Sequence, residues 1–346
     1  MKNISFVLLL FFAFFISNIY ANVHCENYPH WKCNNAELVK IDQFLQKHAN
    51  KGYVAAFDWD GTLYEQDIVV KPGDVHAGDT RSGQSIWHLW GAKHGYFPEF
   101  VTRSGKTANN VALRDDYIEG KTNISADAYS KFSQIAVYEA GMTPEEMHQG
   151  VSDYAKRYPP KNYGYFKMLD VMQAFKNHGY QVWIVTGSNP YFIATLLENL
   201  DQTLGYNLLP KGCDAKHPRI SACHIAGNEA KLSPNGKFTM VYDDRFVDVA
   251  SPNGPLYLER NIVDGPGKTI VMKNYIKKKS HKPIVFYAGN SGGDYEIVQY
   301  VLNQSNGLDA FVVAVNPVGT LTDLVKKYVP QGKLAVVSDQ SKVSNE

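Results

Sequence analysis

The chain has 346 residues, which is enough to bury a large core and fits two structural units. Lys plus Arg (35) and Asp plus Glu (34) nearly balance and leave a formal net charge of +1. Bulk charge therefore gives no indication of nucleic-acid binding, and we expect no nucleic-acid partner. The 22 tyrosines fit ring-lined surfaces and core packing equally well.

The first residues have the features of an export signal. Lys2 precedes an apolar block at 7–16, and Ala21 ends a plausible cleavage site. The block is short for a membrane span, and no other long apolar run follows it. We expect a signal peptide over 1–21, a periplasmic or secreted protein, and no stable membrane span after processing. An uncleaved anchor is the alternative.

Four cysteines follow this signal: Cys25, Cys33, Cys213 and Cys223. An exported chain can keep disulfides, and four cysteines allow three pairings. We favour the two local pairings, 25 with 33 and 213 with 223, each of which closes one loop. A four-thiolate zinc site is the alternative, but the chain lacks the close C-x-x-C pairs that make such a site convincing.

Residues 35–48 carry a helical stripe of apolar side chains and lead into the segment 53–63, YVAAFDWDGTL. Its first five residues have the composition of a buried strand. Asp58 and Asp60 follow, and because alternate residues of a strand point the same way, both carboxylates can emerge where the strand ends. Ligands bind at that end of the strands in open α/β sheets.

Such a carboxylate pair can attack an electrophile with one oxygen and move a proton with the other. It can also hold a hard cation such as magnesium. Gly61 permits a tight turn, and Thr62 offers a hydroxyl and an amide to an anion. A calcium loop, for which a further ligand near Thr62 is missing, and an ordinary Asp-Gly turn are the other interpretations.

The pattern changes after residue 63. Residues 71–107 are rich in Gly, His and Trp, and 122–158 are typical of a set of helices, with a capped helix start at 143–146. No alternation of strands and helices occurs between about 69 and 163. We interpret this part as an inserted helical unit.

Alternation returns with a helix at 165–178 and a buried strand at 181–185. Thr186 and Gly187 follow directly, before a helix at 191–200. A hydroxyl and a glycine between a strand and a helix start fit a small anion site, and they also fit an ordinary turn.

The region 207–264 is punctuated by Gly and Pro. Strand-like pieces at 222–226 and 238–242 flank a turn at 233–236. The acidic turn at 243–245 is more typical of a solvated local ion pair than of a metal site.

Two further positions carry polar groups of interest. Lys268 follows a Gly-Pro-Gly turn and directly precedes a predicted helix at 269–279, so it can bind a phosphate or carboxylate or simply be solvated. The strand at 283–288 ends in a glycine-rich loop at 289–294, where Asp294 can bind a metal or merely cap the next helix. The remaining predicted core elements are a strand at 311–316 and a helix at 320–328.

Four sequence motifs, in this order along the chain, resemble those of the haloacid dehalogenase superfamily. Within it, the chain resembles the phosphoserine phosphatases and the phosphorylcholine phosphatases. The motifs are DWDGT at 58–62, Thr186, Lys268 and the loop 289–294. The resemblance implies an α/β fold, with a three-layer Rossmann-like core around a mainly parallel sheet and an inserted, mostly helical cap. The implied domains are a core formed by 22–66 and 165–346 and a cap over 67–164 that closes over the site.

The resemblance also implies a magnesium-dependent phosphomonoester hydrolase that works through an aspartyl-phosphate. Asp58 would be the nucleophile, and Asp60 would protonate the leaving oxygen and then activate water. The residues expected to hold the phosphate are Thr62, Thr186, Gly187 and Lys268. The groups expected to hold Mg²⁺ are Asp58, the Asp60 carbonyl, and Asn290 or Asp294. Many relatives have aspartate where this chain has Asn290, which leaves the metal site with one negative charge less.

Four rings of the expected cap, Trp87, Trp90, Tyr96 and Phe97, could cage a quaternary ammonium or simply pack the cap. Our leading substrate hypothesis is a small phosphorylated metabolite, with phosphocholine as the first candidate. Phosphoserine, phosphoethanolamine or a broad acid phosphatase activity is the alternative. A non-catalytic protein that binds a phosphorylated ligand is the second alternative.

Overall fold

The structure is a computed structural model, and it describes residues 23–97, 138–242, 263–304 and 307–342. The predicted signal peptide at 1–21 and the acidic turn at 243–245 lie outside these ranges. Among the helices that the structure describes, none is both long and apolar enough to cross a membrane.

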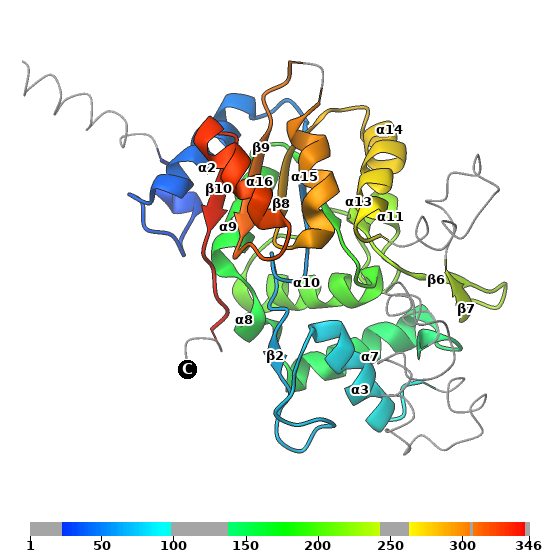
Figure 1. The fold of residues 1–346 in the computed structure, drawn as a ribbon. Coiled ribbons are helices and arrows are strands. Elements are labelled where there is room, and N and C mark those ends of the chain that lie inside the picture. The colour runs from blue at the N-terminus through cyan, green and yellow to red at the C-terminus, as the bar shows by residue number, and fades with distance from the viewer. Residues whose placement is uncertain (1–22, 98–137, 243–262, 305–306, 343–346) are drawn as a thin grey trace, which may run out of the picture.

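A parallel sheet forms the centre of the molecule (Figure 1). In the described part of the chain it has six strands in the order β10-β9-β8-β1-β4-β5, and every neighbouring pair is parallel. The strands are β1 (Val54–Phe57), β4 (Gln181–Val185), β5 (Ile225–Ala226), β8 (Ile284–Gly289), β9 (Phe311–Val315) and β10 (Leu334–Val337). Because β1 lies between β8 and β4, the aspartates that follow it emerge in the middle of the sheet edge.

Helices cover both faces of this sheet and complete three layers (Figure 1). One face is covered by α2 (Ala36–His48), α9 (Phe166–Asn177) and α10 (Pro190–Leu204). The other is covered by α13 (Pro266–Val271), the π-helical turn η2 (Met272–Ile276), α14 (Lys277–Ser280), α15 (Tyr295–Leu302) and α16 (Leu321–Tyr328). The strands are apolar on both faces, as a buried parallel sheet requires, and the predicted fold class is confirmed.

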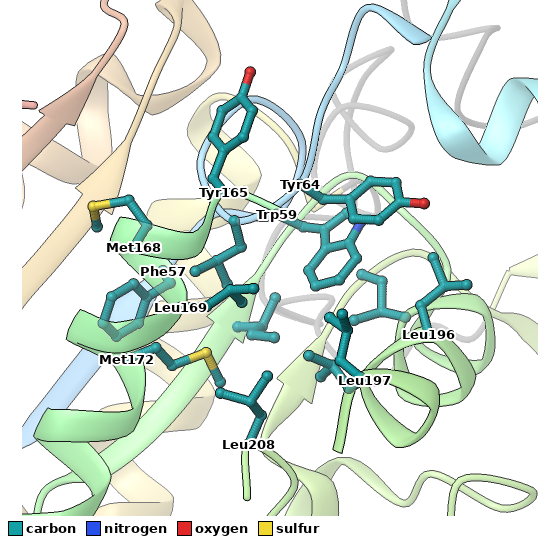
Figure 2. Packing of buried hydrophobic residues seen from close by; sticks show 14 of the residues in the cluster. Phe57, Trp59, Tyr64, Tyr165, Met168, Leu169, Met172, Leu196, Leu197 and Leu208 are labelled. Atoms are coloured by element: carbon teal, nitrogen blue, oxygen red, sulfur yellow. The ribbon is translucent and has the colours of Figure 1, made fainter. Parts of the chain in front are cut away.

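Phe57 anchors the core on the α9 side of the sheet. Its ring lies 5.3 Å from the ring of Phe286 on β8 and 6.1 Å from that of Phe175 on α9. Figure 2 shows Phe57 beside Met168 and Leu169 of α9. This packing fixes the last residue of β1, and therefore the point from which the two aspartates emerge.

The described parts of the predicted insert are mainly helical. They contain α3 (Gly83–Lys93), α7 (Pro144–Arg157), α8 (Pro160–Tyr163) and a small pair of strands, β2 (Ile68–Val69) and β3 (Thr80–Arg81). The capping box at the start of α7, between Thr143 and Glu146, agrees with the predicted helix start. Figure 1 shows α3 and α7 at the end of the molecule beyond α10, and His148 of α7 lies 2.8 Å from Glu198 of α10.

Of the predicted strand at 222–226, only Ile225–Ala226 form a strand (β5), and the prediction that this strand flanks the turn at 233–236 is wrong. Residues Ile220–Cys223 form the short helix α11, and β5 joins the edge of the main sheet beside β4. The partner of β7 (Phe238–Tyr242) is β6 (Ala230–Leu232). Local apolar content cannot show that β5 pairs with a strand far back along the chain. Strand β10 is also missing from the prediction, because its apolar run has only four residues.

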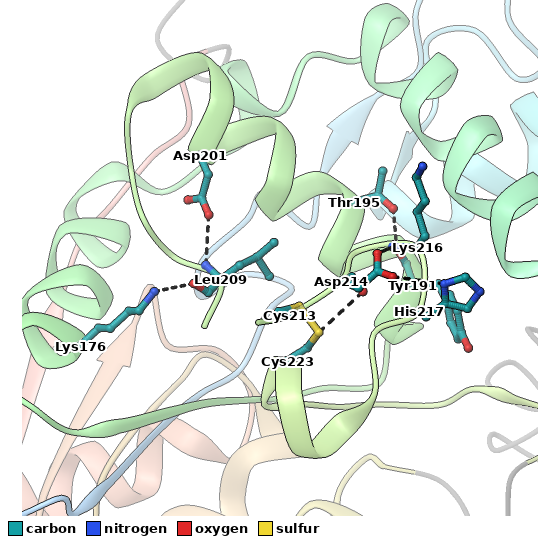
Figure 3. Close-up of a disulfide and its surroundings, with 10 residues drawn as sticks. All are labelled: Lys176, Tyr191, Thr195, Asp201, Leu209, Cys213, Asp214, Lys216, His217 and Cys223. Atoms are coloured by element: carbon teal, nitrogen blue, oxygen red, sulfur yellow. Dashed lines mark hydrogen bonds and ion pairs between the residues drawn. A yellow bond between two sulfur atoms is a disulfide. The ribbon is translucent and has the colours of Figure 1, made fainter. Parts of the chain in front are cut away.

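Both local disulfides are present, Cys25–Cys33 and Cys213–Cys223, as predicted. Figure 3 shows the second one and the polar contacts around it. Lys176 donates a hydrogen bond to the carbonyl of Leu209, and Asp201 Oδ2 accepts one from the Leu209 amide at 3.1 Å. These contacts fasten the long connection between α10 and β5 to the core.

We expect Phe286→Ala to lower the free energy of unfolding by about 3–5 kcal/mol, because a fully buried ring leaves a cavity between the sheet and α9. The control is Val69→Ala, whose side chain is 53% exposed and whose loss should cost less than about 0.5 kcal/mol. Urea unfolding followed by circular dichroism measures both. Equal stability of the two variants would contradict the assignment of this core.

Candidate active site

The chain turns sharply where β1 ends. The Asp58 amide donates to the Ala288 carbonyl at 2.8 Å, so the sheet still holds the backbone at the first aspartate. Gly61 has φ of +72°, and a Cβ at this position would collide with the Asn290 amide. The amide of Thr62 donates to the Trp59 carbonyl at 3.2 Å and is used by the turn itself. The Thr62 hydroxyl is buried and has no hydrogen-bond partner among the described residues, so it is the group left for a ligand.

Lys268 joins two of the predicted carboxylates. Its Nζ lies 2.9 Å from Asp58 Oδ1 and 2.7 Å from Asp294 Oδ1, and all three side chains are buried. The lysine comes from the first turn of α13, while the two acids follow β1 and β8. Neighbouring parallel strands therefore place both acids at one edge of the sheet, where the helix start supplies the cation between them.

Both oxygens of the Asp294 carboxylate accept two hydrogen bonds each from groups of the protein. Its Oδ1 accepts from Lys268 at 2.7 Å and from the Tyr287 hydroxyl at 2.6 Å. Its Oδ2 accepts from the backbone amides of Asn290 at 2.9 Å and Ser291 at 3.2 Å. Four donors occupy the lone pairs of this group, so Asp294 shapes the loop and holds Lys268, and a direct bond to a metal would have to displace one of these donors.

The charges in this cluster do not balance. Burial, followed by the charge of Asp294, raises the pKa of Asp58 well above its ordinary value, and Lys268 opposes that shift. Burial disfavours the charged lysine, but Asp294 and Asp58 outweigh it and raise the pKa of Lys268. Burial also disfavours charge on Asp294, yet Lys268 and the Tyr287 hydroxyl hold its pKa below the ordinary value. Asp294 is thus the constant counterion of Lys268, and the negative charge of Asp58 is the one left over.

Asp60 faces the loop after β4. Its Oδ2 accepts from the Ser188 hydroxyl at 2.7 Å, and the Ser188 amide donates to Thr186 Oγ1 at 3.1 Å. The Asp60 Oδ1 is buried without a hydrogen-bond partner in the described chain. Burial raises the pKa of Asp60, while Ser188 and Lys268 oppose the shift. A carboxyl group with a raised pKa and one free oxygen is suited to give and take a proton.

The loop that carries Thr186 and Gly187 is held from two sides. From the core, Asn228 Nδ2 donates to the Gly187 carbonyl at 2.7 Å. From the insert, Gln84 Oε1 accepts from the Asn189 amide at 2.8 Å, and Glu139 accepts from the Asn189 side chain. The insert is therefore bonded directly to the loop beside Asp60.

Asn290 lies against the turn at Gly61. Its Nδ2 donates to Gln66 Oε1 at 2.9 Å, which fixes the orientation of the amide. Its Oδ1 accepts no hydrogen bond from the described residues, so the oxygen is the available end of this side chain. This arrangement fits the prediction that Asn290 presents an oxygen to a metal.

The residues present fit a magnesium ion on two grounds. The buried cluster holds the carboxylates Asp58 and Asp294 against the single ammonium of Lys268, and the half-buried Asp60 lies beside it, so a divalent cation would offset an excess of negative charge. Oxygen ligands suit Mg²⁺, and Asp58, the Asp60 carbonyl and Asn290 offer them. Among the described residues, no group of three or more His, Cys, Asp or Glu forms a ready-made metal site, so backbone, amide and water oxygens would complete the shell.

The four rings proposed as an ammonium cage lie against one another in the insert. The ring of Trp87 lies 6.1 Å from that of Trp90, 5.7 Å from that of Tyr96 and 5.3 Å from that of Phe97. Trp87 and Phe97 are fully buried. These contacts fit core packing of the insert, the other role considered for the rings.

Sequence reasoning missed three residues that touch the predicted ones: Ser188, Tyr287 and Gln66. Ser188 stands in the predicted turn after β4, and its hydroxyl was the available signal. The sequence around Tyr287 is typical of a buried strand, and no neighbouring residue in the sequence indicates that its hydroxyl group contacts Asp294. Gln66 lies beyond the motif and is brought to Asn290 by the turn.

No protein-family model matches the chain, and no curated protein matches it. Among solved structures, it is similar to a conserved functionally unknown protein from Anaerococcus prevotii DSM 20548, at 15% identity over 88% of this chain and 94% of that one, with a TM-score of 0.49. It is also similar to cytosolic 5'-nucleotidase IIIB bound to cytidine, at 12% identity over 90% and 89% of the two chains, with a TM-score of 0.44.

A third similar structure is a phosphoserine phosphohydrolase-like protein from Francisella tularensis subsp. tularensis SCHU S4. It shares 14% identity over 76% of this chain and 86% of that one, with a TM-score of 0.36. Likenesses at these identities and scores carry no argument about activity. The function has to follow from the site itself.

We expect Asp294→Asn to lower the free energy of unfolding by about 3–5 kcal/mol near neutral pH, because it removes the counterion of a buried lysine. The matched control is Asp323→Asn, which breaks an exposed pair with Lys326 at 3.5 Å and should cost less than about 1 kcal/mol. Since the pKa of Asp294 is lowered in the folded protein, its contribution is present above the ordinary Asp pKa of about 3.9 and is lost as the pH falls below it.

Denaturant unfolding of both variants and the parent at several pH values measures this contribution. A loss for Asp294→Asn no larger than that for Asp323→Asn would contradict the role given to the buried pair.

Proposed function

We propose that the protein is a magnesium-dependent phosphomonoester hydrolase that works through an aspartyl-phosphate on Asp58. The observation that carries the proposal is the meeting of Asp58, Lys268 and Asp294 in one buried ion-pair network at the edge of the parallel sheet. Asp60 and the Thr186 loop border the same network. A carboxylate beside a fixed cation, with a second carboxyl group two residues away, is suited to phosphoryl transfer.

In the first half-reaction, an oxygen of Asp58 attacks phosphorus, and the bond from phosphorus to the leaving oxygen breaks. Asp60 gives its proton to that oxygen as it leaves. In the second half-reaction, Asp60 takes a proton from water, the water oxygen attacks phosphorus, and the Asp58 carboxylate is released with inorganic phosphate. Lys268, Thr62, Thr186 and Gly187 are proposed to hold the phosphoryl oxygens, with Lys268 offsetting their charge.

Asp58, the Asp60 carbonyl and Asn290 are proposed to hold the magnesium ion. When bound, the ion would offset the charge between the carboxylate and the phosphate, which otherwise repel one another. We assign Asp294 a supporting part, because its oxygens are occupied by four donors.

We further propose that 22–66 and 165–346 form the core and 67–164 the cap, and that the protein is exported. The mainly helical insert and the two disulfides support these proposals. The substrate is proposed to be a small phosphomonoester. The four cap rings pack on one another, which lends no support to an ammonium cage. Activity assays with phosphocholine, phosphoethanolamine and phosphoserine are therefore needed to identify the substrate.

Asp58→Asn should abolish phosphate release from every phosphomonoester tested, because an amide oxygen cannot form the acyl phosphate. Asp67→Asn makes the same change at an exposed position nearby and should keep the parent activity. Release of inorganic phosphate, with folding checked by circular dichroism, measures both. Parent-like turnover in the Asp58 variant would refute the nucleophile, and no turnover by the parent on any substrate would favour a non-catalytic binding protein.

Removal of divalent ions with EDTA should stop turnover, and added Mg²⁺ should restore it. Because an ion that binds only the folded state stabilises it, Mg²⁺ should also raise the melting temperature of the parent, and less so that of Asp58→Asn. Scanning calorimetry with and without Mg²⁺ measures this shift. Full activity in EDTA would rule out the metal.

A further inference from the structure

A groove runs between the α13–α14 segment and α15, on the outer side of the helices that carry Lys268 and Asp294. Figure 1 shows these helices side by side on one face of the sheet. The groove has a cavity volume of about 600 Å³, within the range of small-molecule sites. None of the steps proposed for phosphate hydrolysis uses its residues.

Three side chains that line this groove carry a buried polar atom without a hydrogen-bond partner in the described part of the chain: Thr269 Oγ1, the Tyr300 hydroxyl and Gln304 Oε1. Thr269 is only 8% exposed. Helical threonines commonly bond to the carbonyl four residues earlier, and Thr195 of α10 does so at 2.8 Å. Thr269 leaves that bond unmade, so its hydroxyl keeps an unused hydrogen-bonding capacity in the wall of the groove.

The groove is also positively charged. Lys273 and Lys277 line it, and neither forms an ion pair within the residues that the structure describes. The Nζ of Lys273 lies 4.8 Å from the ring centroid of Tyr300, which holds the lysine over the groove wall. Among the lining residues, Glu296 is the one acid. Two lysines against one glutamate favour an anionic occupant.

The backbone of this wall is irregular. The turn Met272–Ile276 is π-helical, an arrangement that interrupts the regular α-helical ladder and is frequent at functional sites. Thr269 directly follows Lys268, and Tyr295 at the other wall directly follows Asp294. Residues of the groove therefore directly follow residues of the buried ion pair at the starts of α13 and α15.

We propose that this groove is a second ligand site, which binds a small organic anion that carries a carboxylate or phosphate and a hydrogen-bond donor. The lysines and the hydroxyls of Thr269 and Tyr300 bind the anionic group, and Gln304 Oε1 accepts from the donor. The site goes beyond the proposed hydrolase activity and does not depend on it.

The test measures how far a bound ligand protects each lysine of the full-length mature chain from chemical labelling. Reductive methylation of lysine amines is followed by mass spectrometry, without additive and with either of two probes that are not phosphatase substrates. Salicylate supplies a carboxylate and a hydroxyl donor, and phenylphosphonate supplies a phosphate-like group. Binding in the groove should slow labelling of Lys273 and Lys277 several-fold. Lys278, exposed on the same helix end and outside the groove, is the internal control.

Protection by salicylate alone, by phenylphosphonate alone or by both supports the site and shows which anionic group it prefers. Tyr300→Phe, which removes one hydroxyl and keeps the ring, should weaken the protection, whereas Tyr53→Phe, outside the groove, should not. The proposal is overturned if neither probe at millimolar concentration protects Lys273 more than Lys278, or if Tyr300→Phe leaves the protection unchanged. Because no turnover is measured, failure here leaves the hydrolase proposal intact.

Discussion

The structure depends on one ammonium group placed between two carboxylates in a space without bulk water. Lys268 pairs with Asp58 and Asp294, and the second of these pairs is completed by Tyr287 and two backbone amides. Burying charges is costly unless they are paired and hydrogen-bonded, so this cluster persists only because the sheet and α13 hold its members at fixed positions. The two carboxylates are not stabilised equally. The negative charge of Asp58 is offset less than that of Asp294, and burial, followed by the charge of Asp294, raises the pKa of Asp58. In the proposed function, this carboxylate, whose charge Lys268 offsets only in part, is the nucleophile.

The topology explains why residues so distant in sequence meet. Each of β1, β4 and β8 ends at the same edge because the strands are parallel, and each is followed directly by a functional segment. Gln84 and Glu139 of the insert bond to Asn189 in the loop beside Asp60, so hydrogen bonds join the insert to this loop. The groove between α13 and α15 lies on the opposite side of the same helix starts.

Much of this arrangement could be predicted from the sequence. Strong apolar runs identify β1, β4 and β8, and polar residues directly after them identify the edge where the candidate site lies. The weaker elements could not be predicted, because β5 and β10 are short and take their stability from partner strands that local patterns do not specify. The same limit applies to contacts. The sequence shows Asp294 at a helix entry, but only the folded chain shows that Tyr287 closes its last hydrogen bond.

In the proposed mechanism, an oxygen of Asp58 forms a bond to phosphorus. Acid quenching of the protein during incubation with a phosphomonoester, followed by borohydride reduction and peptide mass spectrometry, detects this bond, because reduction of an acyl phosphate converts that aspartate into homoserine. We expect homoserine at position 58 in the presence of substrate and none in its absence. Homoserine at another position, or none at all while phosphate is being released, would contradict it.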